Sequence, residues 1–110
     1  MRVRIPRRKV CEKFLLIYEL EGCQNAVDFL TGYYGVRKMR IILDGRKVGN
    51  GYNACYIENE AYFKKRGLNK RAILHELYHH SVYSKEIEKP NRTEEKEANI
   101  HARKFLEFHF

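Results

Sequence analysis

The spacing of apolar residues in the first third of the chain predicts a long amphipathic helix. Successive apolar positions lie four, three, four, three and four residues apart, which places them on one helical face. These positions are Leu16, Leu20, Cys23, Val27, Leu30 and Tyr34. We expect a helix from about Val10 to Tyr33 that is weakened locally at Gly22. The alternative is a strand over the segment FLLIYEL followed by a shorter helix.

Between Val36 and Lys65 the pattern changes to short runs of β-forming residues separated by turn residues. The run KMRIILD is followed by the glycine-rich segment GRKVGNG and then by a second run, YNACYIE. A tight corner at residues 58–60 leads into a third run, AYFKK. This order predicts a three-stranded meander, and therefore a mostly antiparallel sheet.

Two more helices are expected after the strands. Asn69 is a good N-cap for the first, and Leu68 and Ile73 can form a hydrophobic staple across its start. Pro90 ends the loop that follows this helix. Asn91 or Thr93 can cap the last helix, which we expect over 94–108 with glutamates in its first turn. The fold class is therefore α+β.

Composition limits the size and the environment of this fold. A chain of 110 residues with 44% hydrophobic content forms one small domain, residues 1–110. The apolar run 14–18 is too short for a signal peptide or a membrane span, so we expect a soluble, cytoplasmic protein without membrane contact. Three cysteines without a Cys-x-x-Cys spacing fit reduced thiols that are mostly buried: Cys11, Cys23 and Cys55.

The chain carries a formal net charge of +8, and residues 1–9 alone hold five basic side chains. Such an arm can contact nucleic acid or attract acidic partners. The other interpretation is an ordinary solvated surface, because 33% of all residues are charged and lysines mix with glutamates elsewhere. No recognised nucleic-acid motif accompanies the charge, so nucleic-acid binding is the weaker hypothesis.

The segment LNKRAILHELYHHSVY carries the strongest chemical signal. His75 and His79 lie one turn apart on one helical face, so their imidazoles can bind the same metal ion. Glu76 lies about 100° around the helix, where it is poorly placed as a ligand but well placed to contact a water on that ion. This arrangement indicates a single catalytic zinc ion. The competing interpretation is that the histidines only form hydrogen bonds in a core.

A catalytic zinc site needs a third protein ligand, and the last predicted helix offers one. Glu95 and Asn99 lie four residues apart, so Glu95 can complete the coordination while Asn99 orients a ligand histidine from behind. Glu94 is the alternative third ligand. Ala98 and Ala102 allow the two helices to approach closely.

Two further histidines are expected to play no part in coordination. His80 follows His79 directly and therefore points about 100° away, into solvent or into packing. His101 projects away from Asn99 and serves elsewhere.

The residues from Asn53 to His80, NACYIENEAYFKKRGLNKRAILHELYHH, together with EKEAN at 95–99, resemble the gluzincin zinc metallopeptidases. Among these the chain is most similar to the minigluzincins, small soluble archaeal proteins. The resemblance covers about residues 52–102 and implies a small zincin-like domain. Its parts would be an N-terminal helix, the sheet, an active-site helix and a glutamate helix.

The resemblance also implies roles for individual residues. His75, His79 and Glu95 would hold zinc, and Glu76 would act as the general base. The segment Asn53-Ala54-Cys55-Tyr56 matches the edge strand that receives an extended substrate, and an edge strand can bind peptide by strand addition. Cys55 stands where an aromatic residue is common. Asn99 replaces an aspartate, which would weaken zinc binding or slow turnover.

These observations favour a zinc endopeptidase that cleaves extended or unfolded protein substrates. A second donor for the developing oxyanion is expected, with three candidates: Tyr78, His101 and Arg103. The alternative function is a catalytically silent or self-inhibited zinc-stabilised interaction module. The edge strand and the aromatic tail FLEFHF also suggest a homo-oligomer that covers the cleft.

Overall fold

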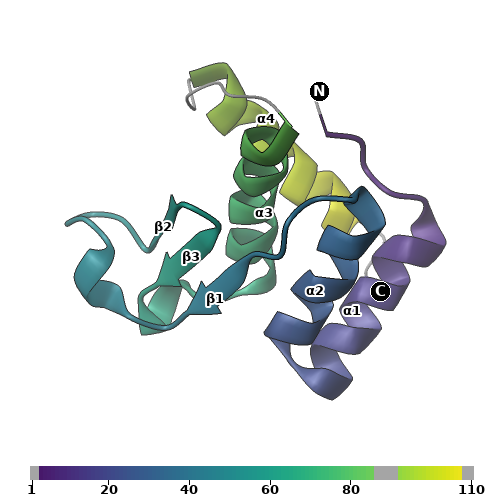
Figure 1. The fold of residues 1–110 in the computed structure, drawn as a ribbon, viewed down its shortest axis with the longest axis horizontal. Helices are drawn as coiled ribbons and strands as arrows, with labels where there is room; N and C mark the ends of the chain where they lie inside the picture. Colours follow the sequence, from purple (N-terminus) through teal and green to yellow (C-terminus); the bar gives the residue numbers. More distant parts are fainter. Residues whose placement is uncertain (1–2, 86–91, 108–110) are drawn as a thin grey trace.

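The computed structural model describes residues 3–85 and 92–107. Two helices open the chain, α1 (Arg8–Glu21) and α2 (Cys23–Tyr34), and they pack side by side (Figure 1). The single helix predicted over 10–33 is therefore wrong. Gly22 separates the two helices with a φ of 98°, a left-handed conformation that glycine adopts without steric cost. The amphipathic spacing continues through the break, so periodicity alone did not reveal it.

A three-stranded sheet follows, with β1 (Arg40–Ile42), β2 (Ala54–Ile57) and β3 (Glu60–Phe63). Its order is β1-β3-β2, with β2 antiparallel and β1 parallel to β3. The α+β class and the three-stranded sheet are confirmed, whereas the sequential meander is wrong. The segment between β1 and β2 is long enough for β2 to lie at the far edge of the sheet. Strand β3 then occupies the central position between them. A two-residue turn at Glu58 and Asn59, with φ values of 42° and 68°, joins β2 to β3.

The outer edge of β1 is closed by a side chain rather than by a strand. Gln24 of α2 accepts a hydrogen bond from the Ile41 amide at 2.8 Å and donates one to the Met39 carbonyl at 3.0 Å. This side-chain amide therefore takes the place of a neighbouring peptide group. In the described part of the chain, β2 is left as the edge of the sheet that faces away from these contacts.

Helices α3 (Lys70–Lys85) and α4 (Arg92–Leu106) complete the fold. Asn69 caps α3 as predicted, since its Oδ1 accepts the Ala72 amide at 2.9 Å. In Figure 1, α3 lies between the sheet and the α1–α2 pair, and α4 crosses it. The predicted caps of α4 include Asn91, which lies outside the described residues, as does Pro90, and the helix begins at Arg92 rather than Glu94. None of the described helices is long and apolar enough to cross a bilayer.

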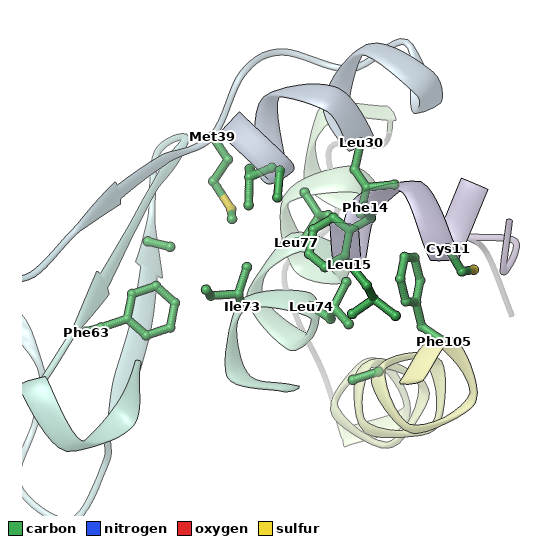
Figure 2. Close-up of a cluster of buried hydrophobic side chains, with 14 residues drawn as sticks. Cys11, Phe14, Leu15, Leu30, Met39, Phe63, Ile73, Leu74, Leu77 and Phe105 are labelled. Carbon is green, nitrogen blue, oxygen red and sulfur yellow. The ribbon is translucent and has the colours of Figure 1, made fainter. Parts of the chain in front are cut away.

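The larger of two core clusters among the described residues joins the sheet to the four helices. Figure 2 shows Ile73, Leu74 and Leu77 of α3 at its centre, between Phe63 of the sheet and the side chains of the other helices. The remaining labelled members are Cys11, Phe14, Leu15, Leu30, Met39 and Phe105. Burying a large apolar side chain contributes about 1.5–3 kcal/mol, so α3 is fixed firmly by one face. Its opposite face is free to carry polar chemistry.

The basic N-terminal segment is not the free arm that its charge suggested. Val3 is only 2% exposed, and the Arg4 carbonyl accepts a hydrogen bond from the Tyr34 hydroxyl. Pro6 is buried, and its carbonyl accepts from the Cys11 thiol. The segment is anchored through its backbone and small apolar side chains. All three cysteines are free thiols, as predicted, but only Cys11 is buried, whereas Cys23 and Cys55 are partly exposed. Cys11 and Cys23 lie on different helices.

Candidate metal centre

Helix α3 presents His75 and His79 on the face opposite the core. The residues between and before them, Ile73, Leu74 and Leu77, are buried, which fixes the rotation of the helix. His79 is 5% exposed, and the side chain of His75 is 19% exposed. Both imidazoles therefore lie at the base of a cleft, accessible from one side.

Helix α4 brings the carboxylates to this face. Glu94 and Glu95 lie in its first turn, where the helix dipole favours negative charge. Ala98 and Ala102 are both fully buried, as expected for a close approach between α3 and α4. The first turn of α4 is thereby placed over the two histidines.

The candidate ligand atoms of His75, His79 and Glu95 converge. The two Nε2 atoms lie 3.2 Å apart. One carboxylate oxygen of Glu95 lies 2.8 Å from Nε2 of His79, and the other lies 3.2 Å from Nε2 of His75. The three residues thus form a group that could hold a metal ion.

The outer nitrogens of both imidazoles are already engaged. Nδ1 of His75 lies 2.8 Å from Oδ1 of Asn99, and Nδ1 of His79 lies 2.5 Å from Oε2 of Glu94. Both partners are acceptors, so each Nδ1 carries the proton. When both imidazoles are neutral, their Nε2 lone pairs therefore point at each other and at the Glu95 carboxylate. Three electron-rich groups at such distances favour a bound cation.

These separations are short enough for the three residues to bind one metal ion. With bonds of about 2.0–2.1 Å to nitrogen and oxygen, a tetrahedral site has ligand atoms about 3.3–3.4 Å apart. The observed separation of 3.2 Å between the two Nε2 atoms is close to that value, and the Glu95 oxygens lie nearer, at 2.8 Å from His79 and 3.2 Å from His75. Three protein ligands would leave a fourth position of a tetrahedral ion open to a small molecule.

Burial shifts the pKa of the ionisable groups around this centre. Burial, together with the nearby His79, lowers the pKa of His75, which favours the neutral imidazole. Burial also raises the pKa of Glu76 to about 7, with His79 opposing this shift and Glu95 adding to it. Glu76 is 7% exposed and lines the cleft beside the cluster without belonging to it.

The cleft over the cluster has a volume of about 560 Å³. Strand β2 forms one wall, and the histidines and glutamates form its base. The lining residues are Gly49, Tyr52, Ala54, Cys55, Tyr56, His75, Glu76, His79 and Glu95. The sheet edge predicted for substrate binding is therefore next to the candidate metal ligands.

The pairing register shows which backbone groups of β2 face the cleft. The Asn53 carbonyl accepts the Lys64 amide, and Cys55 lies opposite Tyr62. Hydrogen-bonded residues alternate along an antiparallel pair, so Asn53, Cys55 and Ile57 direct their backbone groups toward β3. The N–H and C=O groups of Ala54 and Tyr56 consequently face the open edge, where an extended peptide could bind.

His80 holds this strand against α3 and takes no part in the metal cluster. It is completely buried, and its Nε2 donates to the Arg37 carbonyl. Its Nδ1 must then accept from the Tyr56 hydroxyl, 2.7 Å away. The same hydroxyl accepts the Asn59 amide at 3.1 Å. The side chain of His80 therefore packs in the interior and does not point into solvent. Its hydrogen bonds fix β2 relative to the candidate metal centre.

Several residues expected in or near the site lie elsewhere. Tyr78 is buried and donates to Glu97, and His101 is buried beside Tyr34. Neither these two nor Arg103 lines the cleft, so none of the oxyanion candidates is placed for that role. Asn53 precedes β2 rather than belonging to it.

Sequence reasoning missed the place of Glu94 and the contribution of Tyr52. Glu94, taken as the alternative ligand, instead supports His79 from behind and is 1% exposed. Its burial at the first turn of α4 depends on the rotation of that helix, which no periodicity signal fixed. Tyr52 lines the cleft from the loop before β2, although it was expected within a strand.

Comparisons with known proteins find no relative of this chain. No protein-family model matches the chain, and searches of curated proteins and solved structures find no match either. The function of this chain is therefore inferred from the geometry of its own residues.

Proposed function

We propose that this protein is a zinc-dependent endopeptidase that hydrolyses peptide bonds in extended or unfolded protein substrates. The observation that carries the proposal is the convergence of the lone pairs of His75 and His79 on the Glu95 carboxylate. Each imidazole is oriented from behind by an acceptor, as is usual for metal-binding histidines. The buried Glu76 beside this cluster offers a proton acceptor, and the open edge of β2 offers a strand along which a substrate can pair.

The residues then have distinct tasks. Zinc held by His75, His79 and Glu95 would supply Lewis acidity, which activates water and polarises a carbonyl group. Backbone groups of Ala54 and Tyr56 bind the substrate in an extended conformation along β2. Oε of Glu76 takes a proton from the attacking water and delivers it to the leaving amine nitrogen.

The substitution Glu76→Gln tests this assignment. It keeps the size of the side chain but removes its capacity to accept a proton, so hydrolysis of an unfolded protein should fall by about 10²–10⁴-fold. Zinc content, measured by metal analysis, should remain one ion per chain. Glu107→Gln makes the same chemical change at an exposed position outside the cleft and serves as the control. Equal activity in both variants would contradict the role of Glu76.

A zinc-stabilised interaction module that does not cleave is the alternative. It would bind one zinc ion through the same residues, and a chelator would change its stability but no catalytic rate. Cleavage by the wild-type protein that a chelator abolishes and added zinc restores would exclude this alternative. Zinc binding without cleavage would support it.

A further inference from the structure

The cleft does not end at the candidate metal ligands. A second cavity of about 300 Å³ adjoins it and shares three lining residues with it, Ala54, His75 and Glu76. The other residues that line this second cavity are Asn69, Arg71, Ala72 and Asn99. A peptide that lies along β2 with its scissile bond at the metal would therefore place a neighbouring group in this cavity.

Arg71 is the one arginine or lysine among the described residues that line the second cavity, and Glu76 is the one carboxylate there. Arg71 is exposed on the first turn of α3, and it forms no ion pair with any described residue. The adjacent Lys70 differs, because it is paired with Glu19 and lies over the ring of Tyr18. The guanidinium of Arg71 is thus available to a molecule that enters the cavity.

The surroundings of the cavity are also positive. The segment 64–71 contains five basic residues and no acidic one. Gly67 lies so close to the Asn53 carbonyl that a Cβ atom at this position would be 2.5 Å from the carbonyl oxygen. This segment therefore lies directly against the start of β2. On α4, Lys96 and Arg103 are exposed and lie three residues before and four residues after Asn99, on the same face.

We propose that the second cavity binds a carboxylate of the substrate next to the scissile bond, with Arg71 as its main partner. This inference rests on the proposed peptidase function. A guanidinium suits a carboxylate because its planar N–H groups can bind both oxygens. The side-chain amides of Asn69 and Asn99 add neutral polar groups to the same walls. The carboxylate can belong to an acidic side chain or to a free C-terminus.

Matched peptides test the proposal. One pair carries Glu or Gln on either side of a single cleavable bond, and a second pair ends shortly after that bond with a free or an amidated C-terminus. For wild-type protein with zinc we expect kcat/KM to be about three- to tenfold higher for the carboxylate member of at least one pair. The pair that shows this preference identifies the source of the carboxylate.

The variant Arg71→Gln should bring that ratio close to one. Arg66→Gln is the matched control, because it removes one positive charge from the same basic segment at a residue that does not line the cavity. It should leave the ratio unchanged. A ratio of one in wild-type protein, or a preference that survives in Arg71→Gln, would overturn the inference.

Binding of the same peptides, measured by fluorescence anisotropy, separates this inference from the proposed function. If no peptide is cleaved but the carboxylate member binds more tightly through Arg71, the peptidase proposal fails and the carboxylate site stands. If the peptides are cleaved without discrimination and bind equally well, the site fails and the peptidase proposal stands.

Discussion

Removing the negative charge of Glu94 should weaken zinc binding through His79 without touching a ligand. The Glu94 carboxylate is 1% exposed and lies 2.5 Å from Nδ1 of His79. A carboxylate in this position makes the imidazole a stronger ligand, and losing such a partner costs about 10–100-fold in metal affinity. In Glu94→Gln the amide oxygen can still accept the Nδ1 proton, so the substitution removes charge while keeping the hydrogen bond.

The expected effect can be expressed as a shift in melting temperature. At free zinc of about 100 times Kd, binding stabilises the wild-type fold by about 2.7 kcal/mol. For a domain of this size 1 kcal/mol corresponds to about 4 °C, so zinc should raise Tm by about 11 °C. With affinity reduced about 10–100-fold, the same zinc concentration stabilises Glu94→Gln by only about 0.4–1.4 kcal/mol, or about 2–6 °C.

The assay is calorimetric melting with and without zinc, combined with a direct zinc Kd from competition with a chelating dye. Melting of the zinc-free forms in parallel accounts for any effect of the substitution on the fold itself. Asn99→Asp tests the same reasoning in the opposite direction, since it places a carboxylate behind His75, 2.8 Å from its Nδ1. Its affinity gain should be smaller, about two- to fivefold, because Asn99 is exposed.

Glu107→Gln, at an exposed position near the end of α4, is again the control and should leave the zinc Kd unchanged. A Kd for Glu94→Gln within twofold of the wild-type value would refute the view that this carboxylate strengthens His79 as a ligand. Weaker zinc binding by Asn99→Asp would refute it independently.

Two further predictions concern the packing around the site. Burial lowers the pKa of His101 to about 4, below the value of about 6.5 in an unfolded chain. The folded state thus requires a neutral imidazole, and this group should cost up to about 3 kcal/mol of stability as pH falls from 6.5 to 4. Urea unfolding in the presence of a chelator should show that the free energy of unfolding falls less steeply between pH 6.5 and 4 for His101→Gln than for the wild type. The same pH dependence in both proteins would contradict this. Tyr56→Phe leaves His80 and the Asn59 amide without their shared partner, which should lower the free energy of unfolding by about 1–3 kcal/mol. We expect kcat/KM to fall while the zinc Kd stays constant. A parallel loss of zinc affinity would count against this prediction.

The parts of the site that depend on spacing within one helix could be predicted from the sequence. A separation of four residues puts His75 and His79 on one face whatever surrounds them, and the cap at Asn69 is a local hydrogen bond. The contact between Asn99 and His75 joins two helices, and it was expected because the same spacing argument applies to Glu95 and Asn99.

The parts of the fold and the site that depend on tertiary packing were not predicted. Spacing continues across Gly22, so the break between α1 and α2 is visible only in the backbone conformation. The position of β1 beside β3 depends on the loop between β1 and β2 and on the hydrogen bonds from Gln24. Glu94 and Glu95 are neighbours in sequence, and only the rotation of α4 decides which one faces the histidine ring from behind.

The hydrogen bonds of Gln24 have a consequence for how the sheet can grow. Because the Gln24 side chain already bonds the Ile41 amide and the Met39 carbonyl beside β1, an incoming chain gains less by pairing there. Within the described residues, an added strand is therefore directed to β2, beside the histidines. The same side chain that hinders strand addition at one edge therefore directs any polypeptide that docks by backbone pairing to the edge that carries the candidate metal ligands.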